Sequence, residues 1–285
     1  MGDAVGAQQR SFFMNGCSAR SAARAASARL LGGLLSAAGV VFFILVAWWG
    51  LIVGFQLDPL SAKTPADVLH YIFGHEQAAA HRAALAQALG KTLRDAFLGY
   101  MAGMALGSVL AASTSLSRTV EHAVLPIAMV LRSVPLAALT PIVTLIFGHG
   151  LLAVTAVAAI IVFFPTYVNV LLGLRSAPRD MTDLMQAYGA KPMQTFFKVR
   201  VPSAVPALLA SARIAVPAAL IGVLVAEWLV SGGGVGRYMI ESQHALDYGA
   251  LWSAAVALTM ASALLYALVG GTERLVLRWF SGVSW

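Results

Sequence analysis

The stretch Leu184–Pro206, LMQAYGAKPMQTFFKVRVPSAVP, separates two long apolar runs and carries Lys191, Lys198 and Arg200. The chain around it has 285 residues, of which 59% are hydrophobic and only 11% are charged, and its mean hydropathy is +0.80. Such a composition is typical of membrane proteins and lies far from that of soluble domains. The stretch therefore predicts an ordered loop that stands outside the bilayer between two membrane spans.

Six apolar stretches are long enough to cross a membrane. A helix that crosses about 30 Å of hydrocarbon needs roughly 20 apolar residues. Strand-like alternation is absent, which argues against a membrane barrel. We therefore expect an all-α polytopic protein, with a tail at 1–29 and a transmembrane domain at 30–285. The predicted spans cover residues 30–54, 94–115, 122–147, 151–174, 207–230 and 250–271.

The positive charge is distributed unevenly along the chain. The tail, the turn at Arg118, the loop 175–206 and the C-terminal end hold twelve Lys and Arg residues, against five in the opposite segments. By the positive-inside rule, both termini face the cytoplasm of a bacterial inner membrane. The same distribution argues against nucleic acid as the reason for the net charge of +7. An organellar transit peptide is the alternative interpretation of the Arg-rich and Ser-rich tail.

The loop 175–206 contains the pattern of a short amphipathic helix. Asp180 is placed to cap it, and Gly189 to end it, because glycine tolerates a positive φ. A second short helix is expected at 193–199, before the prolines at 202 and 206 return the chain to the membrane. Periodicity leaves open whether the apolar stripe packs on the ends of the chain's own helices or on a soluble partner. The stripe consists of Met181, Leu184, Met185 and Tyr188.

The spacing in this loop is similar to that of the permease subunits of ABC importers. Their loop reads Glu-Ala-Ala, three residues, Gly, nine residues, Ile-x-Leu-Pro. Here Asp183-Leu184-Met185 is followed by three residues, Gly189, nine residues and Val199-Arg200-Val201-Pro202. The departures are Asp183 for Glu, and Leu184-Met185 for Ala-Ala, the second of which makes the docking surface bulkier.

Four further stretches resemble the branch of that family that handles nitrate, sulfonates, taurine, bicarbonate and some vitamin precursors. The resemblance covers about residues 85–271. The stretches are RSVPLAALTPIVTLIFGHG (132–150), FFPTYVNVLLG (163–173), ARIAVPAALIGVLVAEWL (212–229) and GGGVGRYM (232–239).

The resemblance implies a type I ABC importer permease fold and a division of labour. Two permease copies, by default a homodimer in membrane lipid, form the pathway, and an extracytoplasmic binding protein delivers the substrate. Two partner ATPase subunits bind ATP and Mg, because this chain lacks the Gly-x4-Gly-Lys-Ser/Thr loop that cradles phosphates. We therefore expect a transport subunit rather than an enzyme, without a cofactor of its own. The residues implied to couple to the ATPase are Asp183, Leu184, Met185, Tyr188, Gly189, Val199 and Pro202.

Polar residues within the predicted spans are candidates for the translocation pathway or a gate, because charge in hydrocarbon costs about 3 kcal/mol. Arg132 could meet an anionic substrate or pair structurally with Glu227. The carboxylate of Glu227 would repel an anion, which favours a structural or gating role for this residue. For Asn169 we favour a hydrogen bond between helices over a contact with the substrate. Pro135 joins the set because a proline frees backbone groups that only protein or a water-filled cavity can satisfy. The full set of candidates is Arg132, Ser133, Pro135, Asn169 and Glu227.

The sequence leaves two rivals and a broad range of substrates. His70, His75 and His81 lie in one loop without a Cys or a carboxylate cluster, so we expect no metal site, with a zinc site as the alternative. A secondary transporter or channel that acts without an ATPase would predict internal repeats, and none is evident. A membrane scaffold is the other rival. The expected substrate is a small anion such as a sulfonate, nitrate or bicarbonate, or a vitamin precursor.

Overall fold

The computed structural model describes residues 38–74, 76–230 and 232–281, with the side chains at 131, 132, 280 and 281 left undescribed. The chain divides into two compact units, 1–67 and 68–285. In the first unit, the helix Ala38–Gly54 corresponds to the predicted span 30–54, whose residues 30–37 lie outside the described part. Thr64 and Asp67 cap the start of α2 (Pro65–Leu69) reciprocally, with the Thr64 amide donating to the Asp67 carboxylate at 2.8 Å.

Three long helices form the centre of the second unit: α3 (Ala78–Leu116), α6 (Leu151–Arg175) and α9 (Val201–Leu229). Gly99, Gly103 and Gly107 of α3 lie on one face, directly against α6. A Cβ atom at Gly103 would lie 2.6 Å from the Ala159 carbonyl oxygen. Small residues at this spacing allow two membrane helices to approach closely, which is the main source of packing energy where lipid removes the hydrophobic driving force.

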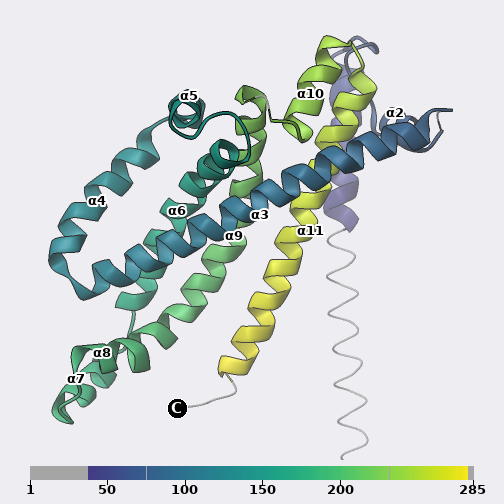
Figure 1. Ribbon diagram of the computed structural model, residues 1–285. Coiled ribbons are helices and arrows are strands. Elements are labelled where there is room, and N and C mark those ends of the chain that lie inside the picture. The colour runs from purple at the N-terminus through teal and green to yellow at the C-terminus, as the bar shows by residue number, and fades with distance from the viewer. Residues whose placement is uncertain (1–37, 75, 231, 282–285) are drawn as a thin grey trace, which may run out of the picture. The chain divides into compact units, whose positions relative to one another are not determined.

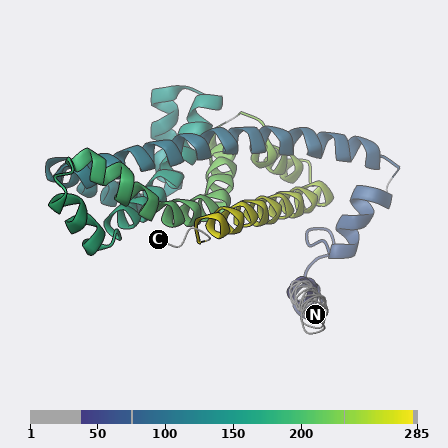
Figure 2. The same cartoon turned by 90° about the horizontal axis from the view of Figure 1, so that it is seen from below.

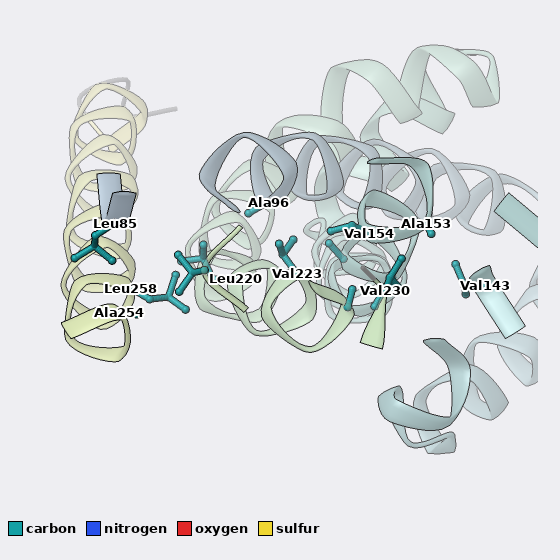
Figure 3. Close-up of a cluster of buried hydrophobic side chains, with 14 residues drawn as sticks. Leu85, Ala96, Val143, Ala153, Val154, Leu220, Val223, Val230, Ala254 and Leu258 are labelled. Atoms are coloured by element: carbon teal, nitrogen blue, oxygen red, sulfur yellow. The ribbon is translucent and has the colours of Figure 1, made fainter. Parts of the chain in front are cut away.

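Aliphatic side chains from these helices meet in one buried cluster, which Figure 3 shows in close-up. Val154 of α6 and Val223 of α9 lie near its middle, and Ala254 and Leu258 bring in α11 (Tyr248–Ser281). Figure 2 shows α11 beside the central helices, and its contacts with α9 are extensive. Several of its buried side chains are valines, which are β-branched, and their stiff rotamers favour a single packing arrangement.

The predicted single span at 122–147 is wrong in detail. The structure places two helices there, α4 (Arg118–Ser133) and α5 (Leu136–Phe147), separated at Val134 and Pro135. Pro135 cannot donate a backbone hydrogen bond, and its ring forces Val134 into an extended conformation with ψ of 127°. At 1.5 Å per residue, the 12 residues of α5 reach about 18 Å, which is too short to cross alone.

Other boundaries also differ from the expectations. The second span, predicted at 94–115, belongs to a helix that begins 16 residues earlier, at Ala78 of α3, because Gly90 weakens a helix without ending it. The segment expected to break at the prolines runs on through α8 (Pro192–Thr195) and the π-helical turn η2 (Phe196–Arg200) into α9. Pro202 lies in the first turn of α9, where a missing amide is tolerated.

Among the residues that the structure describes, four helical runs are long and apolar enough to cross a membrane: Ala78–Leu116, Leu151–Arg175, Pro192–Leu229 and Tyr248–Trp279. Ala38–Gly54 and Leu136–Phe147 are shorter apolar helices. Within the second unit, α7 (Arg179–Ala187) and α8 lie at one end of the long helices, and α10 (Val235–His244) lies at the other (Figure 1). The second unit therefore carries different short helices at the two ends of its long helices.

Candidate coupling surface and outer network

Helix α7 begins directly after Pro178, so Asp180 lies in its first turn rather than at its cap. A carboxylate there still complements the partial positive charge of the helix N-terminus. Gly189 ends the helix with a φ of +71°, as expected from the sequence. The amides of Gly189 and Ala190 donate to the carbonyl oxygens of Gln186 and Met185 at 2.9 Å, which closes the last turn.

The apolar stripe of α7 is largely uncovered by the described chain. Tyr188 is 83% exposed, Leu184 is 52% exposed and Met181 is 40% exposed, while Met185 is half-buried. Asp183 is also exposed, beside the stripe. The sequence left open whether the stripe packs on the chain's own helix ends or on a soluble partner. Of its four side chains, the described chain partly covers only Met185. An uncovered stripe of large side chains on a polar helix is typical of an interaction surface.

Both ends of the loop 175–206, called the coupling loop from here on, are fastened to the adjoining ends of α3 and α4. Arg175, at the end of α6, forms an ion pair of 2.6 Å with Glu121 of α4. Arg200 donates to the Ser115 carbonyl oxygen at 3.2 Å. The hydrogen bond from Arg175 lowers the pKa of Glu121 below its ordinary value of 4.5. The sequence did not predict these two pairings, since partners 54 and 85 positions apart leave no local pattern.

The remaining predicted coupling residues lie where the loop returns to the bundle. Val199 is half-buried in η2, and Pro202 is exposed in the first turn of α9. Phe196, a further residue that the sequence did not single out, is 4% exposed and packs in a buried cluster with Leu174 of α6. It anchors the second half of the loop, so α7 projects from a fixed base.

The predicted pathway residues occupy different elements. Arg132 lies in α4, and its side chain is outside the described part of the structure. Ser133 is exposed beside the helix break and donates to the Val130 carbonyl oxygen at 2.8 Å, and Pro135 is exposed at the break itself. Asn169 is half-buried on α6. The structure gathers Ser133 and Pro135 at one interruption.

Glu227 belongs to a buried hydrogen-bond network at the opposite end of the bundle. Only 1% of its surface is exposed, and its carboxylate accepts from the Thr92 hydroxyl at 2.8 and 2.9 Å and from the Gly236 amide at 2.8 Å. The Thr92 oxygen in turn accepts from the Val235 amide at 2.7 Å. The network joins α3, α9 and α10. Thr92 had no signal in the sequence, because a lone threonine in a span is ordinary.

A second contact on the same side fastens η1 (His70–Gly74) to the turn before α11. The Tyr71 hydroxyl donates to the Asp247 carboxylate at 2.7 Å, and its ring stacks on that of His81. Burial, together with the bond to Asp247, raises the pKa of Tyr71 above its ordinary value of 10.0. Within residues 38–74, 76–230 and 232–281, no group of three or more His, Cys, Asp or Glu is placed to hold a metal ion.

Comparison with known proteins decides the family. Residues 103–281 match the model of the binding-protein-dependent transport system inner membrane component. The chain belongs to this family. Its members form the membrane part of ABC importers, so this chain is an ABC importer permease subunit and a multi-pass inner-membrane protein. The alternative of a secondary transporter or channel is thereby set aside.

Several permeases are similar in sequence. A probable ABC transporter permease of Haemophilus influenzae is 33% identical over 202 residues, covering 69% of this chain and 82% of its own. The formylaminopyrimidine transport permease ThiX of Halalkalibacterium halodurans is 32% identical, covering 67% and 76%. The putative aliphatic sulfonates permease SsuC of Bacillus subtilis is 27% identical over 248 residues, covering 83% and 84%.

Solved ABC transporters share the fold of this permease. An inward-facing MetNI methionine transporter matches with a TM-score of 0.53 at 23% identity, covering 68% of this chain and 94% of its own. An amino acid ABC transporter matches with a TM-score of 0.57 at 14% identity, covering 70% and 95%. The predicted type I importer permease fold is therefore confirmed.

Proposed function

We propose that this permease, paired with a second copy of itself, forms the pathway of an importer that two ATPase subunits drive with ATP and Mg. The observation that carries the proposal is the exposed apolar stripe of α7, on a helix that lies at the end of the bundle and outside the apolar spans. The surface faces the cytoplasm in this proposal, and so do both chain termini. An extracytoplasmic binding protein delivers substrate at the opposite end, beside α10.

The coupling contact follows from the geometry of α7. Met181, Leu184 and Tyr188 enter an apolar cleft of the ATPase, and Asp183 meets a basic residue of that partner. Gly189 sets the direction in which the helix leaves the loop, and Val199 and Pro202 set where the loop re-enters the bundle. Nucleotide-driven closure of the ATPase then biases the spans through this docked helix.

The proposed substrate is a small anion such as a sulfonate, nitrate or bicarbonate, or a vitamin precursor. Relatives are named for formylaminopyrimidine, riboflavin, aliphatic sulfonates, nitrate and taurine. We assign Arg132, Ser133 and Pro135 to the pathway, because the helix break exposes backbone groups that need protein or water partners. Asn169 is the further candidate for the pathway.

The assembly can be tested by purifying the tagged chain from its native membranes in mild detergent and identifying the copurifying proteins by mass spectrometry. We expect an ATPase with a phosphate-cradling loop, and native mass spectrometry should give two copies of each subunit. Recovery of the chain without an ATPase, in a preparation that preserves other membrane complexes, would contradict the proposal.

The coupling surface can be tested with Leu184→Glu, which places a charge in the middle of the stripe. Loss of one buried apolar side chain at an interface centre weakens binding by about 2 kcal/mol, or roughly thirtyfold. Gln186→Glu adds the same charge to the same helix on its other side and serves as the matched control. Copurified ATPase should fall for the first variant and stay unchanged for the second. Equal recovery of the ATPase with the two variants would show that α7 is not part of the interface with the ATPase.

A further inference from the structure

The second half of the coupling loop and α9 form one uninterrupted helical run, Pro192–Leu229. Its 38 residues reach about 57 Å at 1.5 Å per residue, which exceeds the thickness of the hydrocarbon core. The buried side chain of Phe196 anchors the cytoplasmic end, and Glu227 lies near the other end. One continuous helical run therefore extends from the base of α7 to the hydrogen-bond network around Glu227.

At the end near Glu227, this helical run is hydrogen-bonded to both α3 and α10. The Glu227 carboxylate accepts from Thr92 of α3 and from the Gly236 amide of α10, and Thr92 accepts from the Val235 amide. These amides belong to the first turn of α10, where backbone donors have no partner within their own helix. Side chains of α3 and α9 thus cap the N-terminus of α10, which has no side-chain cap of its own.

The glycine-rich loop before α10 lies directly against the Glu227 carboxylate. A Cβ atom at Gly234, whose φ is +95°, would overlap the Glu227 carboxylate. A Cβ atom at Gly236 would lie 2.7 Å from the Leu224 carbonyl oxygen and 2.7 Å from Glu227 Cβ. These two glycines therefore allow the backbone before and at the start of α10 to lie directly on the Glu227 carboxylate.

From this geometry we infer that Glu227 and Thr92 are positioning residues that join the outer end of α9 to α10. The inference rests on the proposed function, because it makes α9 the link between the docked ATPase and the surface that receives the binding protein. When α9 shifts relative to α3, α10 must shift as well, or buried hydrogen bonds must break. Breaking them leaves a carboxylate and two amides unsatisfied in a dry site, which opposes independent movement.

The joint itself can be tested on the purified chain by amide hydrogen exchange of peptides that cover 232–244. Thr92→Val keeps the shape of the side chain and removes the hydroxyl, and Glu227→Ala removes the acceptor. Each should speed exchange of the Val235 and Gly236 amides by about tenfold or more. The conservative variants Thr92→Ser and Glu227→Gln retain hydrogen-bonding groups and should restore slow exchange.

A matched control lies on the same helix. Thr114 is 2% exposed near the cytoplasmic end of α3 and donates to the Leu110 carbonyl oxygen. Thr114→Val should therefore leave exchange in 232–244 unchanged. Wild-type exchange rates in the Thr92→Val and Glu227→Ala variants would overturn the inference. Equal acceleration of peptides throughout the chain would also overturn it, because it would indicate general loosening rather than a joint.

A second readout uses the assembled importer reconstituted in vesicles with its copurified partners. Glu227→Ala should lower uptake per ATP hydrolysed about tenfold while ATPase subunits remain bound, and Glu227→Gln should recover most of it. Wild-type uptake per ATP in Glu227→Ala would overturn the role in coupling. If no ATPase copurifies with the wild-type chain, the proposed function fails, whereas the exchange experiment still decides whether the joint exists.

Discussion

Glycine residues decide how closely the two most extensively packed helices approach. Gly99, Gly103 and Gly107 bring the α3 backbone onto α6, and each added Cβ atom would meet a backbone or side-chain atom there at 3.0 Å or less. Gly90 lies in the same helix, and an added Cβ atom would meet nothing within 4 Å. The same residue type thus serves packing at one position and has no contact role at another.

This contrast gives a matched pair of substitutions. Gly103→Ala should destabilise the chain by about 1–3 kcal/mol, because α3 and α6 must separate to admit the methyl group. Gly90→Ala should be neutral or stabilising by up to about 1 kcal/mol, because alanine favours the helix. Thermal unfolding of both variants in the same detergent checks the prediction, and equal unfolding temperatures would refute the close-packing argument.

The C-terminus of α7 gives a prediction in which conformation alone matters. Gly189 has a φ of +71° and open space around it, so a side chain would meet strain but no clash. Gly189→Ala should cost about 1 kcal/mol and lower the amount of copurified ATPase about fivefold. Gly189→Asn should have a smaller effect, since asparagine tolerates this region of φ and ψ. An asparagine variant as impaired as the alanine variant would indicate a side-chain role instead.

At the scale of elements, the ion pair between α4 and α6 links the coupling loop to the broken helix α4–α5. We expect Glu121→Arg and Arg175→Glu to lower uptake singly and the double swap to restore it. The relevant measurement is uptake per ATP hydrolysed. A double swap worse than either single variant would show that the pair does not act as a unit.

The same pair predicts a pH dependence. Arg175 lowers the pKa of Glu121, so its contribution to stability is present above the ordinary value of 4.5 and is lost only as pH falls through the lowered value. The unfolding temperature of Arg175→Gln should therefore lie below that of wild type at pH 7 and pH 5. The difference should shrink at lower pH. Arg179→Gln, at an exposed arginine nearby, should show no such dependence.

How far the sequence predicts this molecule depends on how local each feature is. The stripe of α7, the positive φ at Gly189 and four of the six predicted spans follow from periodicity and residue type, and the described residues contain them; these spans are 94–115, 151–174, 207–230 and 250–271. The break at Pro135 was overlooked because hydropathy averages across a proline. Thr92, Ser115 and Glu121 could not be foreseen, because each acts through a partner that is distant in sequence and adjacent only in the fold.

At the scale of the whole molecule, the orientation in the membrane can be mapped with single cysteines. Cys17 is the one native cysteine, so Cys17→Ser provides a clean background. Asp183→Cys and Glu241→Cys replace exposed residues at opposite ends of the bundle. The reagent is a maleimide that cannot cross the inner membrane, applied to intact cells whose outer envelope admits it. It should label the Glu241→Cys variant in intact cells and the Asp183→Cys variant only after lysis. Labelling of 183 in intact cells would reverse the proposed topology.

The shortness of α5 bears on how the chain is made. An apolar helix of 12 residues is too short to leave a translocon by partition into lipid, yet α5 packs on α6, which follows it directly. The nascent chain must then retain α4 and α5 beside the insertion channel until α6 has emerged from the ribosome. A ribosome stalled while α6 is still inside its exit tunnel should leave this region accessible to cytosolic protease, and one stalled after α6 has emerged should not. The broken helix thus makes the order of synthesis part of the assembly of the protein.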